Sequence, residues 1–324
     1  MNNMQSTGNI DSSSNNLAKN LHPSKMWNWR EFTIGWSCMG DGAETPAVLL
    51  IHGFGANTHH WRFNQPVLAE ITTTYAIDLL GFGESDQPRA RLDHEPEHDG
   101  SVHYGFDLWG QQVADFCRQK IQRPVLLVGN SIGGVVALRA AQLLEVEADS
   151  SPCQGVVLID CAQRLMDDKQ LNSQPAWMAW IRPLLKLMVQ QRWLSSGLFR
   201  NAARPGVIRK VLQQAYPSGR NIDADLVNLL YQPTQRNGAS EAFRGFINLF
   251  DDHLAPDLMN GFSLPVKLIW GELDPWEPLA KAQQWANSFP CIKSLNVIQG
   301  AGHCPHDEAP EDVNALLLKM AINA

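Results

Sequence analysis

Residues 124–134 read Pro-Val-Leu-Leu-Val-Gly-Asn-Ser-Ile-Gly-Gly, and they place one serine, Ser131, between two different patterns. The apolar run before the serine is typical of a buried strand, and residues 134–142 have the composition of a helix. Glycines on both sides suit a sharp turn, because they carry no side chain that would clash there. The pattern therefore predicts a strand, a tight turn and a helix, with the Ser131 hydroxyl exposed at a sheet edge as a nucleophile.

A serine hydroxyl is a weak nucleophile at neutral pH, and it needs a base and an acid that orients the base. Asp274 comes just after the strand-like run 266–271, and His303 comes after the strand-like run 294–298 and a glycine-rich turn. Both residues follow the carboxyl ends of predicted strands, which is where open α/β sheets place their sites. The chain order of nucleophile, acid and histidine predicts a triad of Ser131, Asp274 and His303.

A further strand-like run, residues 47–51, is followed by His52-Gly-Phe-Gly55. A His-Gly-x-Gly loop supplies one backbone N–H to an oxyanion hole, and the residue after the nucleophile supplies another. We therefore expect the amides of Phe54 and Ile132 to bind the oxyanion. The side chain of His52 is interpreted as structural, shaping this loop. Four strand-end motifs in this order identify the chain as a member of the α/β-hydrolases, with a mostly parallel sheet flanked by helices.

Two residues compete for the roles of acid and base. Asp160 follows the predicted strand 154–159 and is the alternative acid, because this fold sometimes carries the acid one strand earlier; it could instead cap the entrance of the inserted segment. His306 is the alternative base, but it follows a proline and lies farther from the strand-end turn. Serine in place of aspartate at position 131 argues against the alkyl-enzyme chemistry of dehalogenases and epoxide hydrolases.

The chain divides into segments of different pattern. Strand and helix patterns alternate over residues 29–162, which indicates parallel β-α-β packing, and the alternation resumes at Pro265. Between them the strand signals stop, and helical periodicity is broken by prolines. We predict a disordered tail at residues 1–24, a hydrolase core at 25–163 and 265–324, and a helical cap at 164–264.

The composition excludes several classes of partner. The formal charge of −7 over 324 residues argues against nucleic acid, which favours a basic face. The six cysteines show no close pairing and suit reduced thiols, and no apolar stretch reaches the ~20 residues of a membrane span. Residues 1–24 lack the features of a secretory or transit segment, so we expect a cytoplasmic protein. The acidic, histidine-containing stretch 93–103 is interpreted as a solvated loop without metal, and the triad needs no cofactor.

The predicted cap carries many apolar residues interspersed with Arg and Lys. One interpretation is that helices bury this face on the core; the other is a lid that faces the substrate or a membrane surface. Both can hold together, because one helix can bury one side and expose another. We expect substrate contacts from Trp177, Trp180, Leu184, Met188 and Trp193.

Five stretches of the chain carry a closer resemblance: residues 54–62, 75–86, 128–134, 191–199 and 299–305. In them, and over most of residues 45–318, the sequence resembles the cyanobacterial and plastid α/β-hydrolases that include chlorophyll dephytylase and pheophytinase. The Gly-Asn-Ser turn departs from the Gly-His-Ser-Arg-Gly-Gly form of the other chlorophyllases, which are therefore not the model for this chain. The resemblance implies hydrolysis of an ester of a long isoprenoid alcohol, such as the phytyl ester of chlorophyll or pheophytin, near an internal, thylakoid-type membrane.

These observations predict a serine hydrolase that cleaves an apolar ester through an acyl-enzyme. Two alternatives stay open: a cofactor-free haloperoxidase or perhydrolase with the same triad, and a ligand-binding receptor on the hydrolase fold. We expect a small apolar ester as ligand and peripheral membrane contact through the cap. The oligomeric state is left open by the sequence.

Overall fold

The computed structural model describes residues 24–43, 45–145, 152–164, 167–173 and 176–324, and for residues 171–173 and 176–181 it describes the backbone path only. The predicted tail at residues 1–24 therefore lies almost wholly outside the described residues. The predicted cap side chains of Trp177 and Trp180 lie outside them as well.

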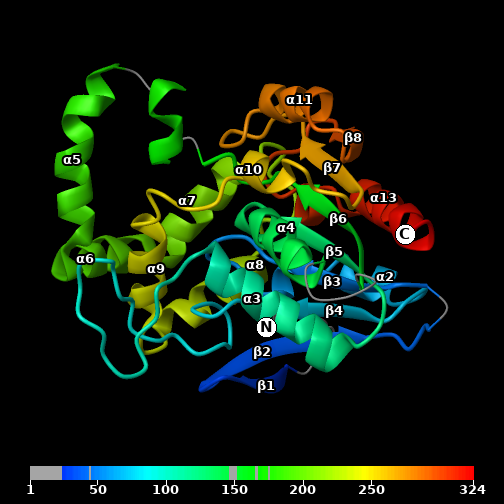
Figure 1. The fold of residues 1–324 in the computed structure, drawn as a ribbon, viewed down its shortest axis with the longest axis horizontal. Helices are drawn as coiled ribbons and strands as arrows, with labels where there is room; N and C mark the ends of the chain where they lie inside the picture. Colours follow the sequence, from blue (N-terminus) through cyan, green and yellow to red (C-terminus); the bar gives the residue numbers. More distant parts are fainter. Residues whose placement is uncertain (1–23, 44, 146–151, 165–166, 174–175) are drawn as a thin grey trace, which may run out of the picture.

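One eight-stranded sheet forms the centre of the molecule, with the strand order β1-β2-β4-β3-β5-β6-β7-β8 (Figure 1). Strands β1 and β2 pair antiparallel, as do β2 and β4, and all other neighbours are parallel. This confirms the predicted mostly parallel sheet. The strands are β1 (Lys25–Trp29), β2 (Phe32–Met39), β3 (Ala47–Ile51), β4 (Thr74–Ile77), β5 (Val125–Asn130), β6 (Cys153–Ile159), β7 (Val266–Gly271) and β8 (Ile292–Ile298).

Helices cover both faces of the sheet, and the buried strands supply apolar residues to each face in alternation. Leu49 and Leu127 belong to one core cluster, whereas Leu50 and Leu126 belong to the other, because successive side chains of a strand point to opposite faces. The core helices are α2 (Gln65–Leu68), α3 (Phe106–Phe116), α4 (Ile132–Glu145), α11 (Leu279–Ser288), α12 (Pro305–Glu308) and α13 (Pro310–Ile322).

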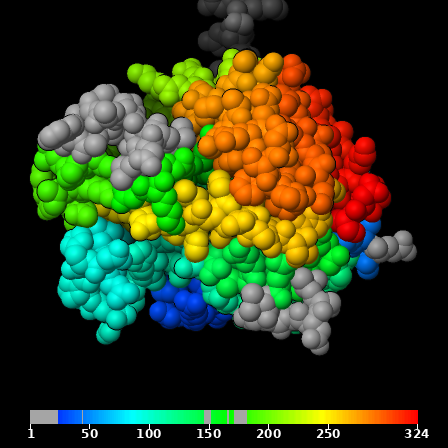
Figure 2. Space-filling model, turned by 45° about the horizontal axis from the view of Figure 1, so that its top comes forward, coloured from blue at the N-terminus to red at the C-terminus, as the bar shows by residue number. Residues whose placement is uncertain are grey.

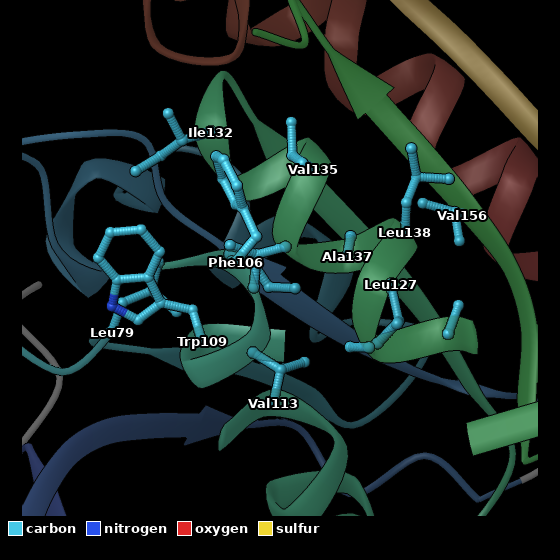
Figure 3. Packing of buried hydrophobic residues seen from close by; sticks show 14 of the residues in the cluster. Leu79, Phe106, Trp109, Val113, Leu127, Ile132, Val135, Ala137, Leu138 and Val156 are labelled. Atoms are coloured by element: carbon cyan, nitrogen blue, oxygen red, sulfur yellow. The ribbon is translucent and has the colours of Figure 1, made fainter. Parts of the chain in front are cut away.

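Helices α3 and α4 pack against each other within the first cluster. Phe106, Trp109 and Val113 of α3 lie in the same buried cluster as Val135 and Leu138 of α4 (Figure 3). Helix α4 begins directly after Ser131, so this packing fixes the start of the helix against the sheet. Burying large side chains of this kind contributes about 1.5–3 kcal/mol each.

A run of helices is inserted between β6 and β7 and lies beside the carboxyl-terminal part of the core (Figures 1 and 2). Loop 84–103 lies against these helices, and Glu95 in it accepts hydrogen bonds from Arg244, at 2.8 and 3.0 Å. The inserted helices are α5 (Ala176–Gln190), α6 (Arg192–Ala202), α7 (Pro205–Ala215), α8 (Ala224–Tyr231), α9 (Ala239–Ile247) and α10 (Ala255–Met259).

No helix among the described residues is long and apolar enough to cross a membrane. The six cysteines carry free thiols; Cys38 is half-buried and the other five are buried.

Candidate active site

Ser131 occupies the turn between β5 and α4 in a left-handed backbone conformation, with φ of 54°. The glycines beside it are needed for steric reasons. A Cβ at Gly129 would lie 2.1 Å from the carbonyl oxygen of Gly133, and a Cβ at Gly133 would lie 2.4 Å from the carbonyl oxygen of Ile51. The chain therefore turns too tightly for any side chain at these two positions, and Ser131 is held at the edge of a cavity that it lines.

Asp274 and His303 are in direct contact. Nδ1 of His303 lies 2.8 Å from Oδ2 of Asp274, while Oδ1 of Asp274 accepts the amides of Trp276 and Glu277, at 2.8 and 3.1 Å. Burial alone would raise the pKa of Asp274, but the hydrogen bond and the charge of His303 outweigh it and lower the pKa of the carboxyl. Asp274 is therefore an ionised acceptor that fixes the orientation of the imidazole.

The structure brings Ser131 and His303 to one cavity, which both residues line. Because Nδ1 of His303 is taken by Asp274, Nε2 is the ring nitrogen left for a substrate or a hydroxyl. The side-chain amide of Asn130 donates to the carbonyl oxygens of His303 and Ile159, at 3.1 and 3.2 Å. The turn that carries the serine is thereby tied to the loop that carries the histidine.

The predicted oxyanion loop lies beside the serine. A Cβ at Gly53 would lie 3.1 Å from Cβ of Ser131, so the loop and the nucleophile turn are in van der Waals contact. Neither the amide of Phe54 nor the amide of Ile132, the first residue of α4, has an acceptor within the described part of the chain. The ring of Phe54 stacks on Phe246 of α9, with ring centroids 3.9 Å apart. Phe54 lines the cavity beside Ser131, and Ile132 follows Ser131 directly in the chain, so the two unpaired amides flank the serine.

His52 has both ring nitrogens engaged by the backbone. Nε2 accepts the amide of Leu79 at 3.0 Å, so Nδ1 carries the proton and donates to the carbonyl of Gly53 at 2.7 Å. Burial lowers the pKa of His52 to about 4, which keeps this neutral tautomer at physiological pH. In this arrangement the side chain fixes the oxyanion loop.

The two competing residues lie elsewhere around the triad. Asp160 is buried, and its Oδ1 accepts the amide of Gly271 at 2.9 Å. His306 does not line the cavity; it is buried against Trp61 and its Nε2 lies 3.4 Å from Nδ1 of His60. Asp274, and not Asp160, therefore contacts the ring of His303, and the imidazole that Asp274 contacts is that of His303, and not that of His306.

The cavity above the triad has a volume of about 370 Å³ and mostly apolar walls. The inserted helices supply Phe199, Ile208, Val211, Leu212, Leu230 and Phe243 to it. The residues predicted to contact the substrate lie elsewhere. Leu184, Met188 and Trp193 do not line the cavity, and they are exposed to solvent because α5 and the start of α6 stand at the outer edge of the molecule (Figure 1).

Sequence reasoning missed a polar chain behind the cavity. The hydroxyl of Tyr216 lies 2.8 Å from Nε2 of His60 and donates to Asp307 at 3.1 Å, and Asp307 also accepts from Arg62 at 2.8 Å. His60 lines the cavity, and Arg62 pairs with Asp223 at the start of α8. The sequence signal for it is the His-His-Trp-Arg run at residues 59–62, which carries part of the family resemblance but gives no hint of a partner in the inserted helices.

Comparison with known proteins gives a consistent result. Residues 48–316 match the model of the alpha/beta hydrolase family. The chain is 27% identical over 321 residues to a chloroplastic pheophytinase of Arabidopsis thaliana, in a match that covers 86% of this chain and 61% of that protein. It is 25% identical over 280 residues to epoxide hydrolase 3 of Xenopus tropicalis, covering 84% of this chain and 70% of that protein. A solved serine hydrolase involved in carbazole degradation has a TM-score of 0.69 at 19% identity, covering 92% of this chain and 98% of that one.

Proposed function

The chain belongs to the alpha/beta hydrolase family, and from this premise we propose that it is a serine-dependent carboxylic ester hydrolase that acts on an apolar substrate through an acyl-enzyme. The observation that carries the proposal is the 2.8 Å contact between His303 and Asp274 beside a cavity that Ser131 also lines. A nucleophile, a base and an orienting acid are the parts that acyl transfer requires.

In the proposed reaction Oγ of Ser131 attacks the ester carbonyl while Nε2 of His303 takes its proton. Asp274 stabilises the imidazolium that forms, and the amides of Phe54 and Ile132 donate to the oxyanion. His303 then gives the proton to the leaving alcohol and afterwards activates water, which releases the acid and restores the serine. An epoxide hydrolase of the alkyl-enzyme type needs a carboxylate nucleophile, which a hydroxyl at position 131 does not provide.

The walls of the cavity support an apolar ester as substrate. Each buried methylene contributes about 0.8 kcal/mol, so a long alcohol or acyl chain gains much of its binding between Phe199, Leu212 and Leu230. That binding energy can be applied to the chemical step while the carbonyl sits at Ser131. The likeness to pheophytinase points to the phytyl ester of pheophytin or chlorophyll.

The test is chromatographic. Purified protein is incubated with pheophytin or chlorophyll in detergent, and pheophorbide, chlorophyllide and free phytol are measured beside the Ser131→Ala variant. We expect phytol release by the wild type alone, and slow turnover of p-nitrophenyl acetate. Fast turnover of the acetate ester without phytol release would be consistent with an esterase but would contradict chlorophyll or pheophytin as its substrate. Acetate-dependent halogenation would instead favour the haloperoxidase, and one slow turnover with retained ligand would favour the receptor.

We also propose that the outer side of α5 and α6 contacts a lipid surface, which would bring the enzyme to an apolar substrate. Leu184 and Leu187 are each 59% exposed and Trp193 is 74% exposed. Large apolar side chains exposed together on one side of a helix are typical of helices that bind at a membrane surface. Co-sedimentation with phosphatidylcholine vesicles should be lost in a Leu187→Ser, Trp193→Ser double variant. Met26→Ser, which changes a residue 53% exposed on β1, is the control and should bind as the wild type does. Equal binding by all three proteins would exclude this surface.

A further inference from the structure

Asp160 is a buried carboxyl that the proposed mechanism does not use. It follows β6 directly, with φ of 43°, a left-handed conformation that Asp and Asn tolerate better than other side chains. Its amide donates to Ile269 at 3.0 Å and its Oδ1 accepts the amide of Gly271 at 2.9 Å. These contacts fix the carboxyl between the ends of β6 and β7, under the turn that carries Asp274.

The second oxygen of this carboxyl has an unusual environment. Oδ2 of Asp160 is shielded from solvent, and no donor reaches it from the described residues. The group within hydrogen-bonding contact is the carboxyl of Asp274, which is itself an acceptor. Two ionised carboxylates in buried contact repel each other strongly, so such a pair shares a proton.

The donors around each carboxyl decide where the proton resides. Asp274 accepts the amides of Trp276 and Glu277 and the Nδ1 proton of His303, all of which stabilise its charge. From the described residues, Asp160 accepts one amide, that of Gly271. Burial, and then the charge of Asp274, raise the pKa of Asp160 well above its ordinary value, whereas the pKa of Asp274 is lowered.

The other titratable groups near Asp160 act in the same direction. Glu277 lies on the loop after β7, Cys161 is the next residue in the chain, and Cys304 follows His303 on the loop after β8. Each of these carboxyl and thiol groups is neutral when protonated and negative when deprotonated. None of them supplies a positive charge that would stabilise an ionised Asp160.

We propose that Asp160 is protonated at neutral pH and donates a hydrogen bond from Oδ2 to the carboxylate of Asp274, as a positioning residue for His303. The inference rests on the proposed function, since it assigns Asp274 as the acid of the triad. The neutral donor restrains the Asp274 carboxylate, whose Oδ2 contacts His303. It adds no negative charge that would compete with Asp274 for the imidazolium.

A direct test reads the protonation state in the resting protein, without turnover. Protein labelled with ¹³C at the aspartate side-chain carboxyls is titrated by NMR, and the Asp160 and Asp274 resonances are assigned by their loss in Asp160→Asn and Asp274→Asn. We expect Asp160 to stay protonated through the range around pH 4 where ordinary aspartates ionise, and Asp274 to stay ionised there. An Asp160 resonance that titrates near pH 4 would overturn the proposal, whether or not the protein hydrolyses esters.

Two variants then test the role in catalysis. Asp160→Asn keeps a neutral donor and should retain kcat within about threefold, whereas Asp160→Leu has no donor and should lower kcat about 10- to 100-fold at similar KM, the effect of losing a hydrogen bond to a charged group. In the profile of kcat/KM against pH, the pH at which activity falls on the acid side should shift in the leucine variant and stay unchanged in the asparagine variant. Equal kcat and pH profiles for the two variants would contradict a positioning role, and a dead asparagine variant would make Asp160 the acid.

Discussion

The side-chain amide of Asn130 donates a hydrogen bond to the backbone carbonyl of His303 across 3.1 Å. The residue before the proposed nucleophile therefore holds the loop of the proposed base, although the two lie 173 positions apart. Both groups are buried, so water cannot replace the bond. Asn130 thus couples the positions of Ser131 and His303.

Replacing Asn130 by leucine should harm both stability and activity. The carbonyls of His303 and Ile159 would lose a buried donor, which costs about 1–3 kcal/mol of unfolding free energy for each group left unsatisfied. Urea unfolding measures the first effect, and the rate of fluorophosphonate labelling of Ser131 measures the second. Asn130→His, which keeps an N–H donor, is the matched control and should lose less. Leucine and wild-type proteins that label equally fast would show that this bond does not position the base.

Replacing Ser131 by alanine or by glycine should abolish activity in both cases, and the difference in stability between the two variants should show the strain of the turn. Ser131→Ala keeps a side chain at φ of 54° and should lower kcat by on the order of 10⁴–10⁶. Ser131→Gly should be equally inactive but roughly 1 kcal/mol more stable than the alanine variant, because glycine adopts left-handed φ without steric cost. Thermal and urea unfolding of the two inactive proteins give the comparison. Equal stabilities would mean that the turn carries no strain, and residual labelling of either variant would remove Ser131 as the nucleophile.

Asp274→Asn should leave the fold intact and lower kcat by roughly 10⁴. The amide can present its N–H₂ to Nδ1 of His303 and so select the wrong imidazole tautomer. Steady-state kinetics on an ester substrate measure the loss, and circular dichroism checks the fold. A mild effect here would mean that another group orients His303.

Glu277 should give substrate binding a pH dependence. Burial, with the nearby charge of Asp274, raises its pKa to about 8, and it lines the apolar cavity. The carboxyl is neutral below that pH and ionises above it, so KM for an apolar ester should rise as pH passes about 8. Glu277→Gln stays neutral and should show no such rise. A wild-type KM that is flat across this range would contradict the assignment.

The same group affects stability, with a sign that follows from its two pKa values. The unfolded chain releases this proton near its ordinary value of 4.5, and the folded protein holds it to about 8. The folded state thus binds more protons within that window, so stability falls as pH rises through it and is level above. Asp78, whose pKa burial raises to about 7, acts in the same direction. The unfolding free energy of the wild type should therefore fall with pH between about 4.5 and 8, and it should fall less steeply in Glu277→Gln. An equally steep fall in the variant would mean that other groups cause the pH dependence.

The sequence predicts the fold and the strand-end positions because both depend on local patterns. Apolar runs that end in turns identify β3, β5, β7 and β8, and parallel pairing of these strands brings their carboxyl ends to one edge. Ser131 and His303 share a cavity for this reason. The tight turn around Ser131 is likewise encoded by the glycines beside it.

The partners of those residues were not predictable, because they come from segments far apart in the chain. No local pattern links Tyr216 with His60, or shows that Asp160 lies against Asp274 with both oxygens shielded. Helical periodicity identifies an apolar side of α5 but does not say whether that side faces a cavity or solvent. The sequence therefore predicts a substrate contact for Leu184, whereas the side chain is exposed and does not line the cavity.

The last turn of α7 also decides how this protein can be re-engineered. The carbonyl of Ala215 accepts the amide of His303 at 2.9 Å, and a Cβ at Gly302 would lie 2.2 Å from the same oxygen. An exchange of the whole inserted segment for that of another hydrolase would therefore remove a support of His303, the proposed base, together with the cavity walls that these helices supply. A chimaera that keeps residues 212–223 and replaces only α5 and α6 leaves this support in place, so the transplantable part of the cap is smaller than the insertion itself.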